Sequence, residues 1–286
     1  VFLSWFTYDV ERPDESVTAN LGEPGHRWLT ATGDITGNQV VLDISIAEGG
    51  IFNASPPVPV QFPDGQMTLE FLDCNTGLIR YTIDSLGLEG EVPIQRIALD
   101  NSPICEAMLE AMETASDPAT DQSREQDASV VQADGDFVIN PGLNDAWSYP
   151  VTDGQGFFIN VFPETERLFL SWFTYDTERP DESVEALLGD PGARWMTAFG
   201  PYVGNEAVLE ITMTEGGIFD DSPPVPERRS DGTMTVVFSD CENGLITFDI
   251  PSIDMQGEVP IQRITLDNVP LCETFTAGSE SAKTVD

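Results

Sequence analysis

Basic residues are scarce in this sequence of 286 residues. Lysine and arginine together number 12, against 50 aspartates and glutamates, and the formal net charge is -38. A field of this sign repels nucleic-acid phosphates and anionic lipid headgroups, so we expect no nucleic-acid partner. The single lysine, Lys283, is typical of an acidic surface that stays soluble where salt screens its self-repulsion.

Long hydrophobic runs are also absent. A membrane-spanning helix needs about 20 consecutive apolar residues, and no stretch approaches that length. We therefore expect no insertion into a membrane and, with no signal-type segment at the start, a mature or trimmed chain.

The four cysteines lack the close spacing of a metal site. Cys74 and Cys105 recur as Cys241 and Cys272, without a CxxC pair and without a neighbouring histidine, which disfavours zinc or redox chemistry. We predict disulfides Cys74–Cys105 and Cys241–Cys272, each lowering the entropy of the unfolded chain by about 3 to 4 kcal/mol. Disulfides indicate an oxidising compartment and hence a secreted, extracellular or cell-surface protein.

The dominant feature of the sequence is an internal repeat. Residues 2–106 align with residues 169–273 without a gap, and roughly three positions in five are identical. We predict a first β-repeat over 1–106, a short helix and acidic linker over 107–134, a complete second repeat over 135–274 and a polar tail over 275–286. A surface presented twice is more typical of a structural or binding protein than of an enzyme.

The second repeat has the pattern of an antiparallel β-domain. Short segments of alternating apolar residues are separated by turn residues, without helices long enough to cross over. We expect eight strands, at 145–149, 156–162, 168–175, 194–199, 207–214, 233–238, 245–250 and 261–266. The predicted fold is all-β, two meander domains that close as up-and-down barrels or pack as sandwiches. Pro180, Asp181 and Ser183 could start a short helix ended by Gly189.

The first repeat lacks the opening strands that its twin possesses, because Val1 aligns with Leu168. The strand at 2–8 is then a bare aromatic edge, which is a template for pairing. Residues before Val1 could be missing, the chain could be a piece of a longer array, or another subunit could donate strands. In the last case the assembly edge is Phe2, Ser4, Phe6 and Tyr8, and the donor resembles Gly156, Phe157, Phe158, Ile159, Val161 and Phe162.

The motifs GQGFF and WFTYD, with the C-terminal DC and LCE runs, are now located. On these motifs the chain resembles a family of bacterial secreted β-domains, a largely uncharacterised module found alone or appended to cell-surface proteins. The resemblance covers both copies and implies export and a β-rich fold. It brings no catalytic residues, and the first copy departs from it in lacking GQGFF.

Residues for catalysis are not evident, and we predict that the protein is not an enzyme. His26, the single histidine, corresponds to Ala193, so no histidine site can exist in both copies. We expect it to be a loop residue without a role. Ser4 and Ser171 lie mid-strand without the GxSxG pattern of a nucleophile, and we interpret them as small outward residues.

Two kinds of ligand stay open. Carboxylates could hold Ca²⁺ in the loop with Asp176, Glu178, Asp181 and Glu182, or in its counterpart with Asp9, Glu11, Asp14 and Glu15, although the spacing matches no fixed calcium loop. A solvated acidic loop is the simpler interpretation, and we predict no cofactor. Trp5, Trp28, Trp172 and Trp195 could form a sugar-stacking face, although tryptophans on strands are more often core.

Together these features predict an extracellular structural or adhesive protein that self-associates, as a filament subunit joined by β-strand donation. The alternative is a carbohydrate-binding module that uses its tryptophans.

Overall fold

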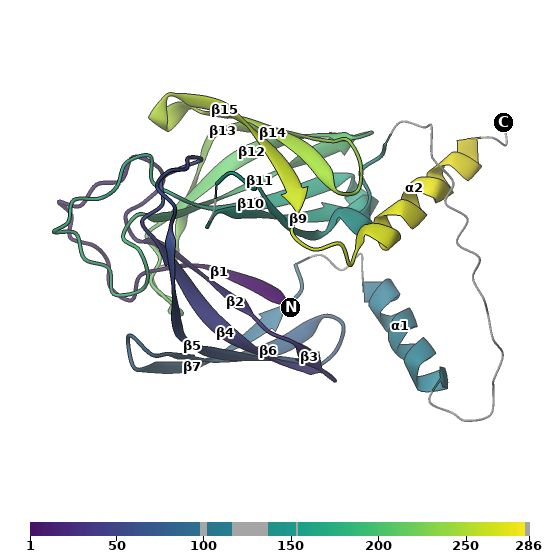
Figure 1. The fold of residues 1–286 in the computed structure, drawn as a ribbon, viewed down its shortest axis with the longest axis horizontal. Helices are drawn as coiled ribbons and strands as arrows, with labels where there is room; N and C mark the ends of the chain where they lie inside the picture. The colour runs from purple at the N-terminus through teal and green to yellow at the C-terminus, as the bar shows by residue number, and fades with distance from the viewer. Residues whose placement is uncertain (98–101, 116–136, 153, 284–286) are drawn as a thin grey trace.

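The computed structural model describes residues 1–97, 102–115, 137–152 and 154–283, and it confirms an all-β fold of two domains (Figure 1). The predicted linker over 116–134 lies outside the described residues.

The first domain is a curled sheet with two free edges. Its strands are β1 (Phe2–Tyr8), β2 (His26–Thr32), β3 (Ile35–Thr36), β4 (Gln39–Glu48), β5 (Val60–Phe71), β6 (Thr76–Ile83) and β7 (Leu88–Gln95). They pair in the order β1-β2-β4-β5-β6-β7, with β3 beside β4. Within the described residues, the strands at the two ends, β1 and β7, are not paired with each other.

The second domain is a closed antiparallel barrel. Its strands are β8 (Asp145–Ser148), β9 (Gly156–Phe162), β10 (Arg167–Tyr175), β11 (Ala193–Val203), β12 (Glu206–Glu215), β13 (Glu227–Phe238), β14 (Asn243–Ile250) and β15 (Met255–Arg263). Strands β8 and β9 close the circle between β15 and β10, and they correspond to the part that the first repeat lacks. The barrel form of the prediction is therefore correct for the second domain.

Short helical segments complete the chain. They are α1 (Ser102–Ala115), α2 (Val269–Lys283), and the 3-10 turns η1 (Pro141–Leu143), η2 (Pro163–Thr165) and η3 (Pro251–Ile253). Each long helix carries the second cysteine of a disulfide. The predicted pairs Cys74–Cys105 and Cys241–Cys272 are confirmed, each with a sequence separation of 31.

Alternation of apolar residues along the strands builds a core inside each domain. In β12, Ala207, Leu209, Ile211 and Met213 are buried while the residues between them are more exposed, because successive side chains point to opposite faces. The two copies share a register shift, between Asp43 and Ser45 in one and between Glu210 and Thr212 in the other. The repeat in the sequence is thus a repeat in backbone geometry.

Several details differ from the sequence-based expectation, including strands β11 and β13, which are longer than the predicted strands at 194–199 and 233–238. The acidic stretch after Asp176 forms turns and irregular backbone rather than a helix, and its Asp181 carboxylate accepts hydrogen bonds from Ser183 instead of capping a continuing helix. The eighth strand spans Met255–Arg263, earlier than predicted, because it pairs with β14 in full register. The expected tail is occupied up to Lys283 by α2.

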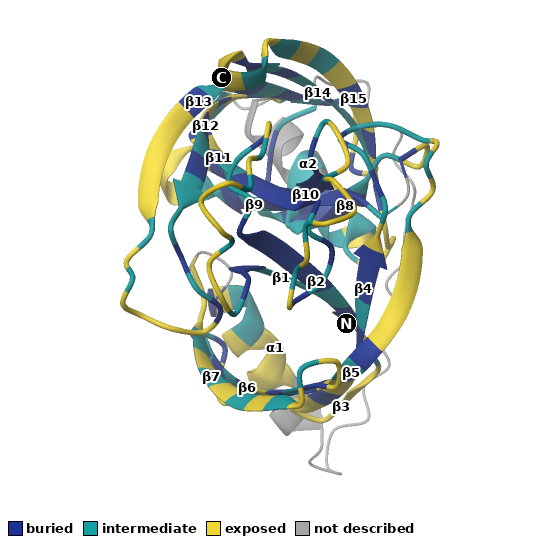
Figure 2. Ribbon diagram, turned by 90° about the vertical axis from the view of Figure 1, so that its left-hand side faces the viewer, coloured by how far each residue is buried: buried dark blue, intermediate teal, exposed yellow. Residues whose placement is uncertain are grey.

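The two domains pack against each other through β1, β2, β10 and β11. Helices α1 and α2 lie on the same side of the molecule (Figure 1). Figure 2 shows buried strands crossing the middle of the molecule and exposed residues on its outer strands.

Candidate functional site: the open sheet of the first domain

The outer edge of β1 presents main-chain groups in regular order. Val1 and Gly33 exchange hydrogen bonds of 2.7 and 3.1 Å, and the amide of Asp9 donates to Gly25 at 2.9 Å. Bonded and non-bonded pairs alternate along an antiparallel ladder. The intervening even-numbered residues, Phe2, Ser4, Phe6 and Tyr8, therefore direct their backbone N–H and C=O groups toward the free edge. In the barrel, β9 occupies that position beside β10.

Among the described residues, part of the first core is half-buried where the core of the barrel is fully buried. Leu3 and Trp5 on β1 are half-buried, whereas their counterparts Leu170 and Trp172 are 0 and 1% exposed. On the opposite edge Val92 and Ile94 are half-buried, and their counterparts Val259 and Ile261 are each 1% exposed. The open sheet therefore exposes apolar side chains along both of its edge strands, β1 and β7. Because burial of apolar surface is favourable, these edges favour pairing with another segment.

A pocket lies at one end of this opening. It has a volume of about 450 Å³ and is lined by Phe6, Thr7 and Tyr8 of β1 and by Ile218, Asp220 and Pro226 from a loop of the second domain. The corresponding place beside β10 is filled by Gln155, which is 6% exposed. The pocket is thus the vacant equivalent of a site that the barrel fills with its own chain.

The side chain of Gln155 shows which groups such a site offers. Its Oε1 accepts hydrogen bonds from the Asn53 amide at 3.0 Å and from Thr174 Oγ1 at 2.5 Å, and its Nε2 donates to the Ile51 carbonyl at 3.0 Å. By the repeat, Thr7, the Asp220 amide and the Ile218 carbonyl are the equivalent groups, and all three residues line the vacant pocket.

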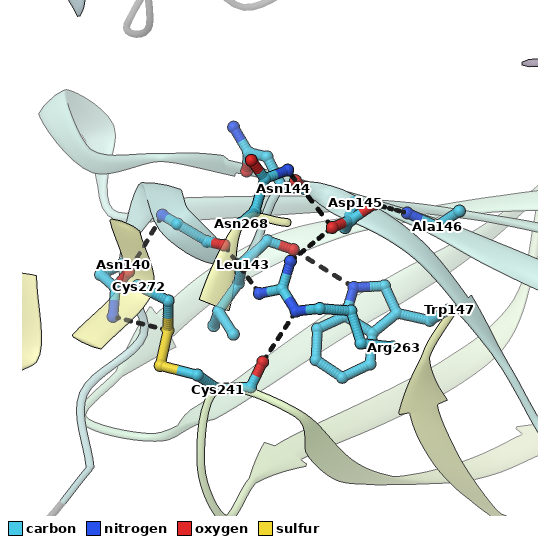
Figure 3. A network of polar contacts seen from close by, with 11 residues as sticks. Asn140, Leu143, Asn144, Asp145, Ala146, Trp147, Cys241, Arg263, Asn268 and Cys272 are labelled. Atoms are coloured by element: carbon cyan, nitrogen blue, oxygen red, sulfur yellow. Dashed lines mark hydrogen bonds and ion pairs between the residues drawn. A yellow bond between two sulfur atoms is a disulfide. The ribbon is translucent and has the colours of Figure 1, made fainter. Parts of the chain in front are cut away.

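At the other edge of the sheet, an arginine at the end of β7 has a different environment from its counterpart in the second domain. Arg263 is buried. Its Nη1 lies 2.6 Å from Asp145 Oδ2, its Nη2 donates to the Gly142 carbonyl at 2.7 Å, and its guanidinium lies over the Trp147 ring (Figure 3). Its counterpart Arg96 is exposed, and Nε donates to the Cys74 carbonyl at 2.8 Å as the Arg263 Nε does to Cys241. No ion pair of Arg96 is found in the described part of the chain.

The aromatic residue beside this arginine also differs in burial between the two domains. Phe238 is 0% exposed and lies 5.4 Å, edge to face, from Trp147. Its counterpart Phe71 is 39% exposed. Within the described residues, no tryptophan covers Phe71 as Trp147 covers Phe238.

The outward side chains of β1 are used within the chain. Phe2 stacks on Phe158 at 5.7 Å, and Phe6 contacts Phe158, Phe173 and Trp195 at 6.1 to 6.3 Å. The phenylalanine side chains of the predicted assembly edge therefore pack against the second domain. The main-chain groups of the same residues face the open side of the sheet. The predicted donor segment, β9, is itself paired on both sides, with β8 and β10.

The interface between the domains is reciprocal. Asp176 accepts from the amides of Asn20 and Leu21, each at 3.0 Å, and pairs with Arg194 at 2.9 Å. Asp9 does the same with the amides of Leu187 and Leu188 and with Arg27 at 2.7 Å. All four charged side chains are buried, and burial lowers the pKa of Arg27 and of Arg194 while their aspartates oppose that shift.

Each domain also inserts a phenylalanine into the other. Phe52 packs on Trp172 and Phe248 of the barrel at 4.8 and 5.6 Å. Phe219 packs on Trp5 and Tyr81 of the first domain at 5.0 and 5.6 Å. The repeats are consequently joined by a packed interface in addition to the linker.

The expectation for His26 was wrong. It begins β2, is fully buried, stacks on Trp195 at 4.5 Å, and its Nε2 donates to the Thr214 carbonyl at 2.5 Å. Burial lowers the pKa of His26 to about 3, and the nearby Arg194 and Arg27 charges add to that shift. Ser171 is also buried rather than outward, because the first domain covers this face of β10.

The tryptophans do not form a sugar-stacking face. Trp28, Trp172 and Trp195 are at most 8% exposed, and half-buried Trp5 contacts Tyr81 and Phe219. The indole N–H groups of Trp28 and Trp195 donate across the interface to the carbonyls of Thr174 and Thr7, each at 2.8 Å. They are core and interface residues.

The acidic candidates for Ca²⁺ are dispersed. Asp176 is committed to Arg194 and backbone amides, Asp181 accepts from Ser183, and Glu178 and Glu182 are exposed. Within the described residues, no three side chains of His, Cys, Asp or Glu gather in a way that could hold a metal ion. Among those residues, no helix is long and apolar enough to cross a membrane.

A pattern in the sequence indicates the interface between the domains, although the sequence-based prediction did not include that interface. Both faces of β1 and β10 carry bulky apolar side chains, and a strand buried on both faces has this pattern. The buried Asp–Arg pairs also occur at equivalent positions in both copies. The difference in burial between equivalent residues of the two domains, in contrast, is visible only in the structure.

Comparisons of the chain with known protein families, with curated proteins and with solved structures find no match.

Proposed function

We propose that this protein is a secreted structural or adhesive component that assembles by β-strand complementation at the open sheet of its first domain. The observation that carries the proposal is that, among the described residues, β1 and β7 each have one edge without a strand partner, at the place where the barrel holds β8 and β9. Main-chain hydrogen bonds and burial of Leu3, Trp5, Val92 and Ile94 would stabilise the contact. The two disulfides are compatible with an extracellular protein.

The donor in this assembly is a strand pair like β8 and β9 from a neighbouring chain. Such a contact joins unlike surfaces and does not close on itself, so it produces a filament. Because the hairpin of each chain is bound in its own barrel, donation first requires that barrel to open. We therefore expect assembly to be slow and to accelerate under conditions that loosen the barrel.

A reversible lock on the hairpin tests the proposal. Asn160 and Phe169 are directly opposed on β9 and β10 and half-buried, so the double substitution Asn160→Cys and Phe169→Cys places two thiols within disulfide range. Electron microscopy should show filaments for the wild-type chain, dispersed particles for the oxidised variant, and filaments again after selective reduction of the new bond. Filaments from the locked variant, or dispersed wild-type chains, would contradict the proposal.

Two further variants test donor and acceptor separately. Deletion of residues 154–162 removes the donor and should abolish assembly. Ser4→Pro removes one edge N–H from β1 while leaving the bonds to β2, and proline is tolerated on edge strands. Ser4→Ala is the matched control, because it removes the hydroxyl and keeps the N–H. Assembly should fail with proline and persist with alanine.

A further inference from the structure

The surface that joins the two domains is built from the same contacts twice. Trp28 donates its indole N–H to the Thr174 carbonyl, and Trp195 donates its own to the Thr7 carbonyl, each at 2.8 Å. Exchanging the two repeats turns one contact into the other, as in the interface of a two-fold symmetric dimer. Such a surface is complementary to a copy of itself.

The main-chain contacts follow the same symmetry. The Phe52 amide donates to the Asp176 carbonyl at 3.0 Å, and the Phe219 amide donates to the Asp9 carbonyl at 3.1 Å. Each phenylalanine then enters the core of the opposite domain. Each repeat therefore has both the loop that inserts the phenylalanine and the strand end that receives one.

The residues that make these contacts are identical in the two repeats. They are an aspartate, a leucine, an arginine, a tryptophan and a phenylalanine: Asp9, Leu21, Arg27, Trp28 and Phe52 in the first repeat, and Asp176, Leu188, Arg194, Trp195 and Phe219 in the second. The glycines at the closest approach also recur, since a Cβ on Gly50 would overlap the Tyr175 ring and a Cβ on Gly217 would overlap the Tyr8 ring. These contacts cannot distinguish a repeat of the same chain from a repeat of another chain.

We propose that this surface also joins different chains, so that two chains exchange repeats and form a dimer. In that dimer the first repeat of each chain packs on the second repeat of the other, through the contacts that hold the single chain together. The inference does not depend on strand donation, because it uses the packed faces of β1 and β10 and the loops beside them rather than the outer edge of β1.

One corner of the surface departs from the symmetry and selects which repeats pair. His26 stacks on Trp195 at 4.5 Å, and its Nε2 donates to the Thr214 carbonyl at 2.5 Å. At the equivalent corner, buried Ala193 and Ala47 replace this polar contact. Two second repeats together would leave each Trp195 without its stacked ring. Only a first repeat paired with a second reproduces both corners.

Concentration decides between the closed chain and the exchanged dimer. The linker predicted over 116–134 keeps the two repeats of one chain at an effective concentration on the order of millimolar, so dilute chains stay monomeric. Exchange requires the whole interface to open, and two chains of net charge -38 repel each other unless salt screens them. We therefore expect dimers after refolding from urea at high protein concentration and high salt.

Cleavage of the linker after dimer formation tests the exchange in the full-length chain. Part of the linker is replaced by a protease recognition sequence, and equal amounts of unlabelled and isotope-labelled chains are refolded together. The dimer is isolated by size-exclusion chromatography and cut, and native mass spectrometry identifies the fragments that stay together.

We expect the cut dimer to fall to units of half its mass, each with one first and one second repeat. Many of these units should combine a labelled fragment with an unlabelled one. Labelled and unlabelled monomers that are mixed and cut without refolding are the control, and they should give only units of uniform label.

The variant His26→Ala tests the selection of partners. Without the histidine this corner no longer favours the pairing of a first repeat with a second, so units of two second repeats and units of two first repeats should appear. Arg80→Ala is the matched control in the same repeat. Arg80 is exposed and pairs with Glu70 and Glu91, so this variant should give the same units as the wild-type chain.

Three results would overturn the inference. Chains that stay monomeric after refolding at high concentration would show that the surface does not join chains. Dimers that remain intact after the linker is cut would place the contact on another surface, and cut units of uniform label would exclude exchange. If His26→Ala gives the same units as the wild-type chain, His26 does not select the partner.

Discussion

Individual buried carboxylates stabilise the interface between the two domains. The Asp176 carboxylate joins Arg194 of its own domain to the amides of Asn20 and Leu21 in the other. Asp176→Asn leaves a buried arginine without its counter-charge, which costs about 3 kcal/mol or more of unfolding free energy. Glu178→Gln, an exposed site in the same loop, should change it by less than about 0.5 kcal/mol. Urea denaturation measures both, and equal effects would contradict this role.

His26 makes stability depend on pH in a defined direction. Its pKa falls from 6.5 to about 3 on folding, so between these values the unfolded state binds more protons than the folded state. The free energy of unfolding should therefore decrease as the pH falls below 6.5, by up to about 1.4 kcal/mol per pH unit from this residue. At neutral pH both states have the neutral ring and this loss is absent.

The variant His26→Ala isolates that contribution, since Ala193 stands at the equivalent position of the other repeat. Denaturation curves at pH 7, 6, 5 and 4 should show a steeper decline for the wild-type chain than for the variant. Parallel declines would show that His26 is accessible to protons in the folded state.

At the scale of secondary-structure elements, α1 and α2 differ in the contacts that stabilise them. Both disulfides have a sequence separation of 31, so loop closure contributes the same amount, about 3 to 4 kcal/mol, in each. Helix α2 also packs on η1, where a Cβ on Gly142 would lie 2.3 Å from Cys272 Cα. On α1, Met108 and Leu109 are 62 and 49% exposed.

Removal of the second disulfide should therefore cost more than removal of the first. Cys241→Ala with Cys272→Ala also loosens the contact between α2 and the segment before β8, whereas Cys74→Ala with Cys105→Ala loosens a helix without that contact. Calorimetry of the two double variants gives the comparison, with each serving as the control of the other. A larger loss from the first pair would be inconsistent with this account.

The sequence predicted the elements better than it predicted their neighbours. Alternating apolar residues and turn residues were enough for the strands of the second barrel and for both disulfides, because these depend on local pattern and on the repeat. The partners of Phe52 and Phe219 within the interface could not be predicted, since both residues lie in loops whose partners are distant in sequence. The Gln155 site is invisible for the same reason: its three partners come from two domains.

At the scale of the whole molecule, the reciprocal phenylalanines should make the two domains unfold together. Phe52 is 4% exposed within the core of the barrel, although it belongs to the first repeat. Phe52→Ala should lower the stability of the entire molecule by about 3 to 5 kcal/mol, with a single transition retained. Phe62→Ala, at a site 45% exposed, is the matched control. Two separate transitions in the wild-type protein would show that the domains are independent.

Within the described residues, a closed barrel packs against a curled open sheet. Pairing of a free edge with a new strand is favourable because it satisfies main-chain groups and covers apolar side chains. The packed interface between the domains holds β1 in place, and an edge that is already ordered lowers the ordering cost of such a pairing. The central claim is therefore that the outer edge of β1 is unpaired in the dispersed chain.

Amide hydrogen exchange at single-residue resolution tests that claim within one molecule. In the dispersed wild-type chain, the amides of Ser4 and Phe6 should exchange much faster than those of their counterparts Ser171 and Phe173, which β9 covers. Assembly should slow Ser4 and Phe6 to the rates of their counterparts. Equal protection of both pairs in the dispersed chain would contradict the account.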